Sequence, residues 1–170
     1  METSEAPITA PPKVEPSPEH RWLQRLAGDW TFTVEQMMGL DPAAPPHTGT
    51  ETVRGLGELW VVARGQSNMG DQPDMSLMTL GYDPARGRFV GTFVGPLMAQ
   101  LWVYEGQLDA AQRVLTLDTE GPSFTGDGST APYQDLIELI GDDERTLTSR
   151  AQGPDGEWQQ LMTMRYRRTG

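Results

Sequence analysis

Residues 101–123, LWVYEGQLDAAQRVLTLDTEGPS, show the pattern that decides the fold of this chain. Apolar and polar residues alternate in two runs, which lie on either side of the turn-like stretch LDAAQ. A period of two is typical of β-strands that bury one face, and a short connection between two such runs predicts an antiparallel hairpin. We therefore expect Trp102 and Tyr104 to share a buried face with Leu115 and Leu117.

The same stretch carries a group of carboxylates that belong either to an acid/base pair or to the solvated side of a sheet. They are Glu105, Asp109, Asp118 and Glu120. Pairing Leu108 with Arg113 across the intervening loop places Glu105 opposite Thr116 and turns the carboxylates away from the apolar face. A bulge of one residue would instead bring Asp118 opposite Tyr104. The solvated side is the interpretation that the apolar pattern favours.

The remainder of the chain repeats this alternation, with runs separated by short stretches rich in Gly, Pro and Asp. Neighbouring runs are expected to pair antiparallel, and so long a meander removes its exposed edges by closing into a barrel. The sequence thus predicts an all-β, ten-stranded antiparallel up-and-down β-barrel. The expected strands are 29–38, 47–56, 58–69, 75–83, 87–95, 99–108, 113–120, 130–140, 145–152 and 157–168.

The N-terminal part differs from the rest. Residues 1–16 are rich in Pro and Glu and predict a disordered tail, because they offer little apolar surface to offset the entropy of ordering. Ser17 is suited to an N-cap and Pro18 to the first helical position, so one short helix is expected over 17–27, ending before Gly28. Residues 17–170 are then expected to form a single barrel domain.

Composition excludes several classes of function. The formal net charge of −11 argues against binding to nucleic acid or to an anionic membrane, since both require clustered Lys and Arg. The chain has no Cys, and its two histidines, His20 and His47, lack the spacing of a metal site. The first residues contain no apolar segment typical of a secretory signal. A cytoplasmic protein is the expectation.

Two sets of motifs resemble known families. The short helix followed by Gly28-Asp29-Trp30 resembles the G-x-W opening of lipocalin and wider calycin barrels, in which the Trp packs across the barrel floor. The stretches LWVYEG, LTLDTEGPS, MTLGYDPARGRFVGT and YQD resemble the DUF1579 family, bacterial proteins of unknown function, over about residues 19–168. The resemblance implies a calycin-like barrel and assigns no catalytic residue.

Lipocalins place an arginine from a late strand over this tryptophan. Arg165 and Arg167 are the candidates here. However, Trp158, Met162, Met164 and Tyr166 share the more apolar face of the last strand, which would turn both arginines outward. The sequence leaves both arrangements open.

A closed barrel of about ten strands tends to leave a central cavity. The residues that we expect to line it and bind a ligand are Trp60, Arg64, Met78, Phe93, Trp102, Tyr104, Glu120 and Met162. Methionine adapts its shape to varied apolar partners. Each residue also has a plainer interpretation as core filling. Arg64 is either a buried charge or part of the outer face, and Glu120 either meets a ligand at the rim or anchors a loop.

The leading hypothesis is therefore that the barrel binds a small, mostly apolar molecule, with no cofactor specified. One alternative is a homodimeric module that acts through its outer surface, with Trp60 or Trp102 exposed at the interface. Another is an enzyme that uses rim carboxylates, with Glu120 as the first candidate. No nucleophile motif occurs, so the sequence favours a binding protein and assigns no catalytic residue.

Overall fold

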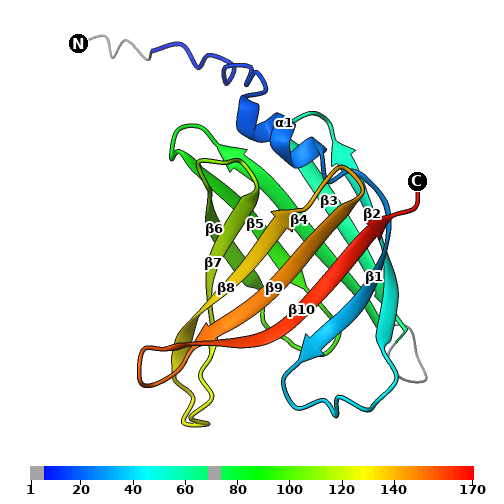
Figure 1. Ribbon diagram of the computed structural model, residues 1–170. Helices are drawn as coiled ribbons and strands as arrows, with labels where there is room; N and C mark the ends of the chain where they lie inside the picture. The colour runs from blue at the N-terminus through cyan, green and yellow to red at the C-terminus, as the bar shows by residue number, and fades with distance from the viewer. Residues whose placement is uncertain (1–5, 69–73) are drawn as a thin grey trace.

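A computed structural model describes residues 6–68 and 74–170 of the chain. The described residues form one closed antiparallel barrel of ten strands, preceded by a short helix (Figure 1). The elements are α1 (Pro18–Gln24), β1 (Gly28–Met37), β2 (His47–Leu56), β3 (Trp60–Ser67), β4 (Asp74–Asp83), β5 (Arg88–Val94), β6 (Trp102–Leu108), β7 (Val114–Pro122), β8 (Thr130–Leu139), β9 (Glu144–Gln152) and β10 (Trp158–Arg168).

The up-and-down topology predicted from the alternation is confirmed. Each strand pairs with the next along the chain, and β1 pairs with β10 to close the barrel. Closure leaves no free edge among the ten described strands, which removes the usual site of edge-to-edge association.

The N-terminus of α1 is built as the sequence indicates. The Ser17 hydroxyl accepts a hydrogen bond from the His20 backbone N–H at 3.4 Å, and Nδ1 of His20 accepts one from the Ser17 backbone N–H at 2.9 Å. Because Nδ1 accepts, Nε2 carries the proton and donates to the Tyr82 carbonyl at 3.0 Å. His20 therefore ties the helix to β4. Residues 6–16 carry no helix or strand, and the expected disorder of 1–16 stays a prediction.

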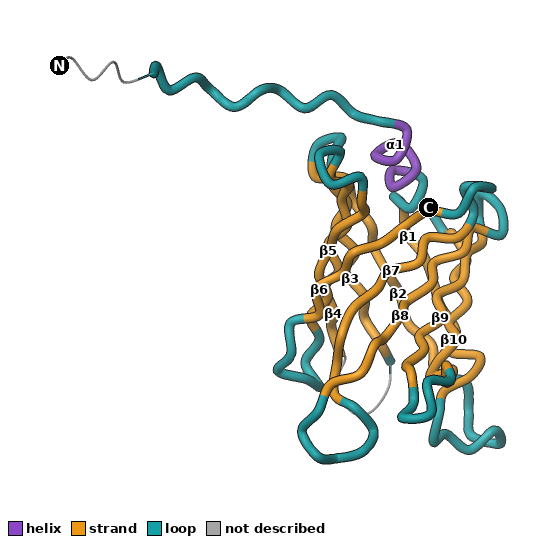
Figure 2. Tube along the Cα trace, turned by 90° about the vertical axis from the view of Figure 1, so that its left-hand side faces the viewer, coloured by secondary structure: helices purple, strands orange, loops and turns teal. Residues whose placement is uncertain are grey.

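Helix α1 closes one end of the barrel (Figure 2). Leu23 is fully buried, and the Trp22 indole donates a 2.8 Å hydrogen bond to the carbonyl of Gln112 in the β6–β7 loop. The Trp30 indole, at the start of β1, donates to the Leu26 carbonyl at 2.9 Å. The best-packed part of the core lies directly beneath this helix. Its fully buried side chains include Trp30, Val53, Val61, Phe89, Leu115, Leu117 and Ile137.

The arginines that cover Trp30 are Arg145 and Arg168, with guanidinium carbons 4.6 Å and 4.2 Å from the ring centroid. Arg165 lies on the outer surface of β10 and pairs with Glu35 and Glu144. The alternation of β10 explains this, because its inward positions are taken by apolar side chains and by Arg168 near the C-terminus. The arrangement with Arg165 or Arg167 over Trp30 is therefore wrong.

The β6–β7 hairpin has a longer loop than expected. Leu108 pairs with Leu115 rather than with Arg113. The Asp109 carboxylate causes this, since its Oδ1 accepts hydrogen bonds from the backbone N–H groups of Arg113 at 2.8 Å and Val114 at 3.0 Å. These bonds also lower the pKa of Asp109. The register changes by two residues, so each side chain keeps the face that was predicted for it.

The carboxylates of this hairpin consequently lie on the solvated side of the sheet. Glu105 is directly opposite Asp118, and not opposite Thr116 as predicted. Glu105 forms an ion pair with Arg86 on the outer surface, and Asp118 accepts a 2.7 Å hydrogen bond from the Gln134 amide. Trp102, Tyr104, Leu115 and Leu117 are buried on the opposite face, as expected.

The two ends of the barrel differ. Short turns at 57–59, 84–87 and 140–143 connect strands at the end that α1 closes, whereas longer connections at 38–46, 95–101 and 123–129 lie at the other end (Figures 1 and 2). This second end, which we call the loop end, contains the cavity of the barrel.

Candidate functional site: a cavity at the loop end

The interior of the barrel is hollow toward the loop end. Two adjoining spaces, of about 540 Å³ and 240 Å³, share lining residues from β1, β4, β5, β9 and β10 and from the β5–β6 connection. The shared residues are Met37, Met78, Phe93, Met98, Leu147 and Met162. We describe the two spaces together as the cavity. Since well-packed interiors leave few voids larger than a water molecule, a space of this size is a feature of the fold to be explained.

Methionine dominates the cavity wall. All seven methionines in the described part of the chain line the cavity: Met37, Met38, Met75, Met78, Met98, Met162 and Met164. Unbranched, polarizable thioethers can repack around ligands of different shape, so the wall is apolar and adaptable rather than shaped for one rigid partner.

Aromatic side chains form the β6–β8 side of the cavity. The rings of Trp102 and Tyr133 pack edge to face with centroids 5.0 Å apart, and Phe124 packs against Tyr133 at 6.3 Å. Trp102 is only 8% exposed, and its buried indole Nε1–H has no hydrogen-bond partner among the described residues. A buried donor without a partner is costly, so a partner for this N–H would be favourable.

The carboxylate of Asp135, on β8, lines the larger part of the cavity. Its Oδ2 accepts a 2.6 Å hydrogen bond from the Tyr104 hydroxyl, and its Oδ1 accepts a 2.6 Å bond from the Ser149 hydroxyl. Burial raises the pKa of Asp135, and these two donors oppose the rise by stabilising the charged form. Burial and the nearby carboxylate raise the pKa of Tyr104. Tyr104 thus remains a hydrogen-bond donor at neutral pH.

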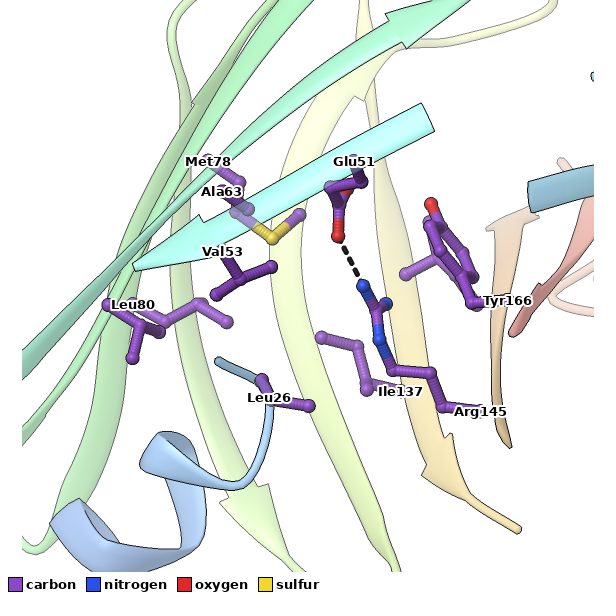
Figure 3. A pocket seen from close by; sticks show the side chains of 11 residues that line it. Leu26, Glu51, Val53, Ala63, Met78, Leu80, Ile137, Arg145 and Tyr166 are labelled. Atoms are coloured by element: carbon purple, nitrogen blue, oxygen red, sulfur yellow. Dashed lines mark hydrogen bonds and ion pairs between the residues drawn. The ribbon is translucent and has the colours of Figure 1, made fainter. Parts of the chain in front are cut away.

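A second polar group separates the cavity from the packed core beneath α1. Arg145 of β9, whose side chain is 4% exposed, forms an ion pair with Glu51 of β2 (Figure 3). Its guanidinium also lies over the rings of Tyr166 at 3.9 Å and Trp30 at 4.6 Å. The carboxylate and the two rings compensate the buried positive charge, so this arginine is already engaged within the protein.

A small void of about 20 Å³ lies beside this group, between Leu26 and Arg145. The Nε atom of Arg145 is buried without a hydrogen-bond partner among the described residues.

Five of the eight residues expected to bind a ligand line the cavity: Met78, Phe93, Trp102, Tyr104 and Met162. The other three lie on the outer surface. Trp60 is 40% exposed and Arg64 is exposed, because these two alternate with the inward Val61 and Ala63. The Glu120 side chain is exposed, and its backbone carbonyl accepts a 2.7 Å hydrogen bond from Gln100.

The polar interior residues Glu51, Asp135, Arg145 and Ser149 were not predicted from the sequence. A signal was present in β8, where Asp135 occupies the same parity as the buried Ala131, Ile137 and Leu139. A charged residue at an inward position of a strand indicates either a partner or a ligand. Its donors come from β6 and β9, and only the assembled barrel brings those strands together.

The described residues contain neither a cluster of metal ligands nor a helix that could span a membrane. Within residues 6–68 and 74–170, no group of three or more His, Cys, Asp or Glu side chains could hold a metal ion. In the same part of the chain, no helix is long and apolar enough to cross a membrane.

Comparison with known proteins places the chain in a family. Residues 15–168 match the model of DUF1579, described as a protein of unknown function, and the chain belongs to this family. Among curated proteins, none matches the sequence.

Two solved structures are similar to a lesser degree. A redesigned β-barrel has 12% identity and a TM-score of 0.46, with 88% of this chain and 96% of that chain covered. A protein of unknown function from the DUF3598 family of Nostoc punctiforme has 11% identity and a TM-score of 0.26, with 90% of this chain and 100% of that chain covered. These likenesses carry no argument about function.

Proposed function

We propose that this member of the DUF1579 family binds a small, mostly apolar molecule in the cavity at the loop end of its barrel. The observation that carries the proposal is the cavity itself, whose larger part has a volume of about 540 Å³ and is lined mainly by methionine and aromatic side chains. Sites for small molecules are typically concave and mostly apolar, with volumes of about 300 to 1,000 Å³ and a few polar groups that orient the ligand.

The arrangement of the two ends supports this function. Helix α1 and the core beneath it close one end, so a ligand would enter at the loop end and be stopped by the polar group of Glu51 and Arg145. An apolar molecule held there would remove both its own surface and that of the methionines from water. The cytoplasmic location expected from the sequence is part of the same proposal.

The proposal is tested by titrating the protein with Nile red, a neutral dye that becomes fluorescent in apolar surroundings. We expect saturable binding, and we expect Met162→Trp to weaken it by filling the cavity from β10. Val103→Trp is the matched control, since Val103 is 57% exposed on the outer surface of β6. Equal dye binding by both variants, or no saturable binding by the native protein, would contradict the proposal.

A second candidate function is association of two copies through the outer surface of β3–β6. Its exposed apolar side chains include Trp60, Val94 and Val103, and Leu101 is exposed directly before β6. In register across these strands, Trp60 packs over Gly81, where an added Cβ would overlap its ring. Exposed apolar side chains on one surface are typical of an interface.

This second candidate is tested by light scattering at several protein concentrations. A dimer that dissociates in Trp60→Ser but persists in Leu40→Ser, an exposed apolar residue of the β1–β2 connection, would support it. A monomer at every concentration would contradict it, and would leave the binding of a ligand inside the barrel unaffected.

A further inference from the structure

Asp135 has hydrogen-bonding capacity that no other described residue uses. A carboxylate has two oxygens with about four sites for accepting hydrogen bonds. Tyr104 and Ser149 each occupy one site, on different oxygens. The carboxylate also lines the larger part of the cavity, where a ligand would be next to it.

The charges around the cavity have one sign. Among the described residues, the charged side chains that line it are Asp135, Glu51 and Asp74, and no Lys, Arg or His does so. Glu51 is neutralised by Arg145, which lies behind it, toward the core. Asp135 has no ion-pair partner among the described residues. A desolvated carboxylate without a counterion is unfavourable, and a cation in the cavity would remove this cost.

From these observations we infer that the ligand is an apolar molecule that carries a protonated amine, and that Asp135 binds the ammonium group. This inference rests on the proposed function and names the chemical class of its ligand. The ammonium donates hydrogen bonds to the free sites of the carboxylate, while the apolar body of the ligand packs against Met78 and Met162.

The walls next to Asp135 suit a cation. The rings of Trp102, Tyr133 and Phe93 line the same cavity, and aromatic faces attract ammonium groups through their quadrupoles. An anionic ligand such as a fatty acid has the opposite preference. Its carboxylate would meet Asp135 with no basic side chain among the described residues of the cavity wall, and the repulsion would be poorly screened inside the barrel.

The test uses decylamine, decanol and decanoate, which share one alkyl chain and differ in the head group. Each is titrated calorimetrically into the full-length protein at neutral pH, below the concentration at which it self-associates. We expect decylamine to bind about tenfold more tightly than decanol, a difference of about 1.4 kcal/mol, and decanoate to bind most weakly.

The decisive variant is Asp135→Asn, which keeps the shape of the side chain and removes its charge. We expect it to abolish the preference for decylamine and to retain the binding of decanol. Asp118→Asn is the matched control, because Asp118 is exposed on the outer surface of β7. The Asp118→Asn variant loses the same charge and should keep the preference for decylamine over decanol. The comparison therefore separates a specific ion pair with Asp135 from general attraction to a protein of net charge −11.

A second measurement needs no variant. In the native protein, the Asp135 carboxyl carbon is followed by NMR as the pH is changed, and we expect saturating decylamine to lower its pKa and decanol not to do so. An unchanged pKa, or an amine preference that survives in Asp135→Asn, would overturn the inference. If decanol and Nile red still bind in that case, the proposed function stands, whereas failure of every probe to bind would overturn both.

Discussion

The Tyr104 hydroxyl donates a 2.6 Å hydrogen bond to Oδ2 of Asp135, although the two residues lie on β6 and β8, which are not paired strands. The bond spans the inner face of β7. Ser149 of β9 completes the group from the neighbouring strand, where it lies directly opposite Asp135. Three strands are thus joined through one carboxylate at the wall of the cavity, so the polar group that would hold a ligand is also part of the barrel's structure.

Removing the Tyr104 hydroxyl tests the strength of this link. We expect Tyr104→Phe to lower the free energy of unfolding by about 1 to 3 kcal/mol, because a buried carboxylate loses one of two donors. Urea unfolding followed by circular dichroism measures the change. Tyr133→Phe serves as the comparison, since the Tyr133 hydroxyl donates to the neutral carbonyl of Pro122 near the surface. A loss in Tyr104→Phe no larger than in Tyr133→Phe would contradict a charge-assisted bond.

The pH dependence of stability reports on Asp135 itself. Burial raises its pKa above the ordinary value of 3.8, so the folded state binds its proton more tightly than the unfolded state. The stability from this group is fully present below pH 3.8 and is lost as the pH rises through the raised pKa. The ionisable groups facing it, Tyr104 and Tyr166, have raised pKa values and stay neutral throughout this range.

We therefore expect Asp135→Asn to gain stability relative to the native protein as the pH rises through this window, since the variant carries no charge to bury. The measurement is the free energy of unfolding of both proteins at a series of pH values from acid to neutral. Taking the difference cancels all other titrations. A difference that is constant with pH would show that the carboxylate is not destabilised by burial.

Alternation along the strands predicted most of the fold, because a period of two is a local property of the sequence. The buried face of Trp102, Tyr104, Leu115 and Leu117 was predicted correctly even though the register was displaced by two residues, since such a shift preserves parity. The displacement arose from Asp109, whose side chain closes the loop through two backbone N–H groups. Both hydrogen bonds depend on the rotamer of the Asp109 side chain, which the periodicity of the sequence does not predict.

The cavity wall was predicted less completely. Met78 and Phe93 were identified because they are apolar residues in recognisable strands, whereas Trp60 looked equivalent and lies outside. The two faces of β3 are similarly apolar, so composition could not distinguish them. The ion pair of Glu51 and Arg145 joins β2 to β9, two strands that are far apart in the sequence. It can form only when the barrel closes. No local pattern encodes it.

The same ion pair offers a test of how the interior charges are compensated. Arg145→Met leaves the Glu51 carboxylate without its partner, and we expect a loss of about 3 to 5 kcal/mol in the free energy of unfolding. The double variant Glu51→Met with Arg145→Met should lose less, since no unpaired charge remains. Urea unfolding of both single variants and the double variant gives the coupling energy. Additive effects would contradict a direct interaction across the barrel.

Close approach of Trp102 to the backbone of β7 makes Gly121 sensitive to substitution. An added Cβ at Gly121 would overlap the six-membered ring of Trp102 and contact the ring of Tyr133. We expect Gly121→Ala to cost about 1 to 3 kcal/mol through overpacking, with a changed near-ultraviolet circular dichroism spectrum. Gly141→Ala is the control, as nothing lies within 4 Å of its added Cβ. Equal stability of the two variants would show that the aromatic wall yields without cost.

The β7–β8 loop at the mouth of the barrel contains a carboxylate with the opposite shift from that of Asp135. The Asp127 carboxylate accepts hydrogen bonds from the hydroxyls of Ser129 at 2.5 Å and Thr125 at 2.7 Å, and from the Ser129 backbone N–H at 2.9 Å. These donors lower the pKa of Asp127 from 3.8 to about 2. Its contribution to stability is thus present above pH 3.8 and is lost as the pH falls through about 2.

We expect Ser129→Ala to raise the pKa of Asp127 toward its ordinary value, because the Ser129 hydroxyl is the largest cause of the shift. NMR titration of the Asp127 carboxyl carbon measures this directly. Ser123→Ala removes another hydroxyl from the same loop that bonds to Thr125 and Ser129 rather than to the carboxylate, so it should change the pKa less. A pKa that moves equally in both variants would assign the shift to the conformation of the loop instead of to the Ser129 hydrogen bond.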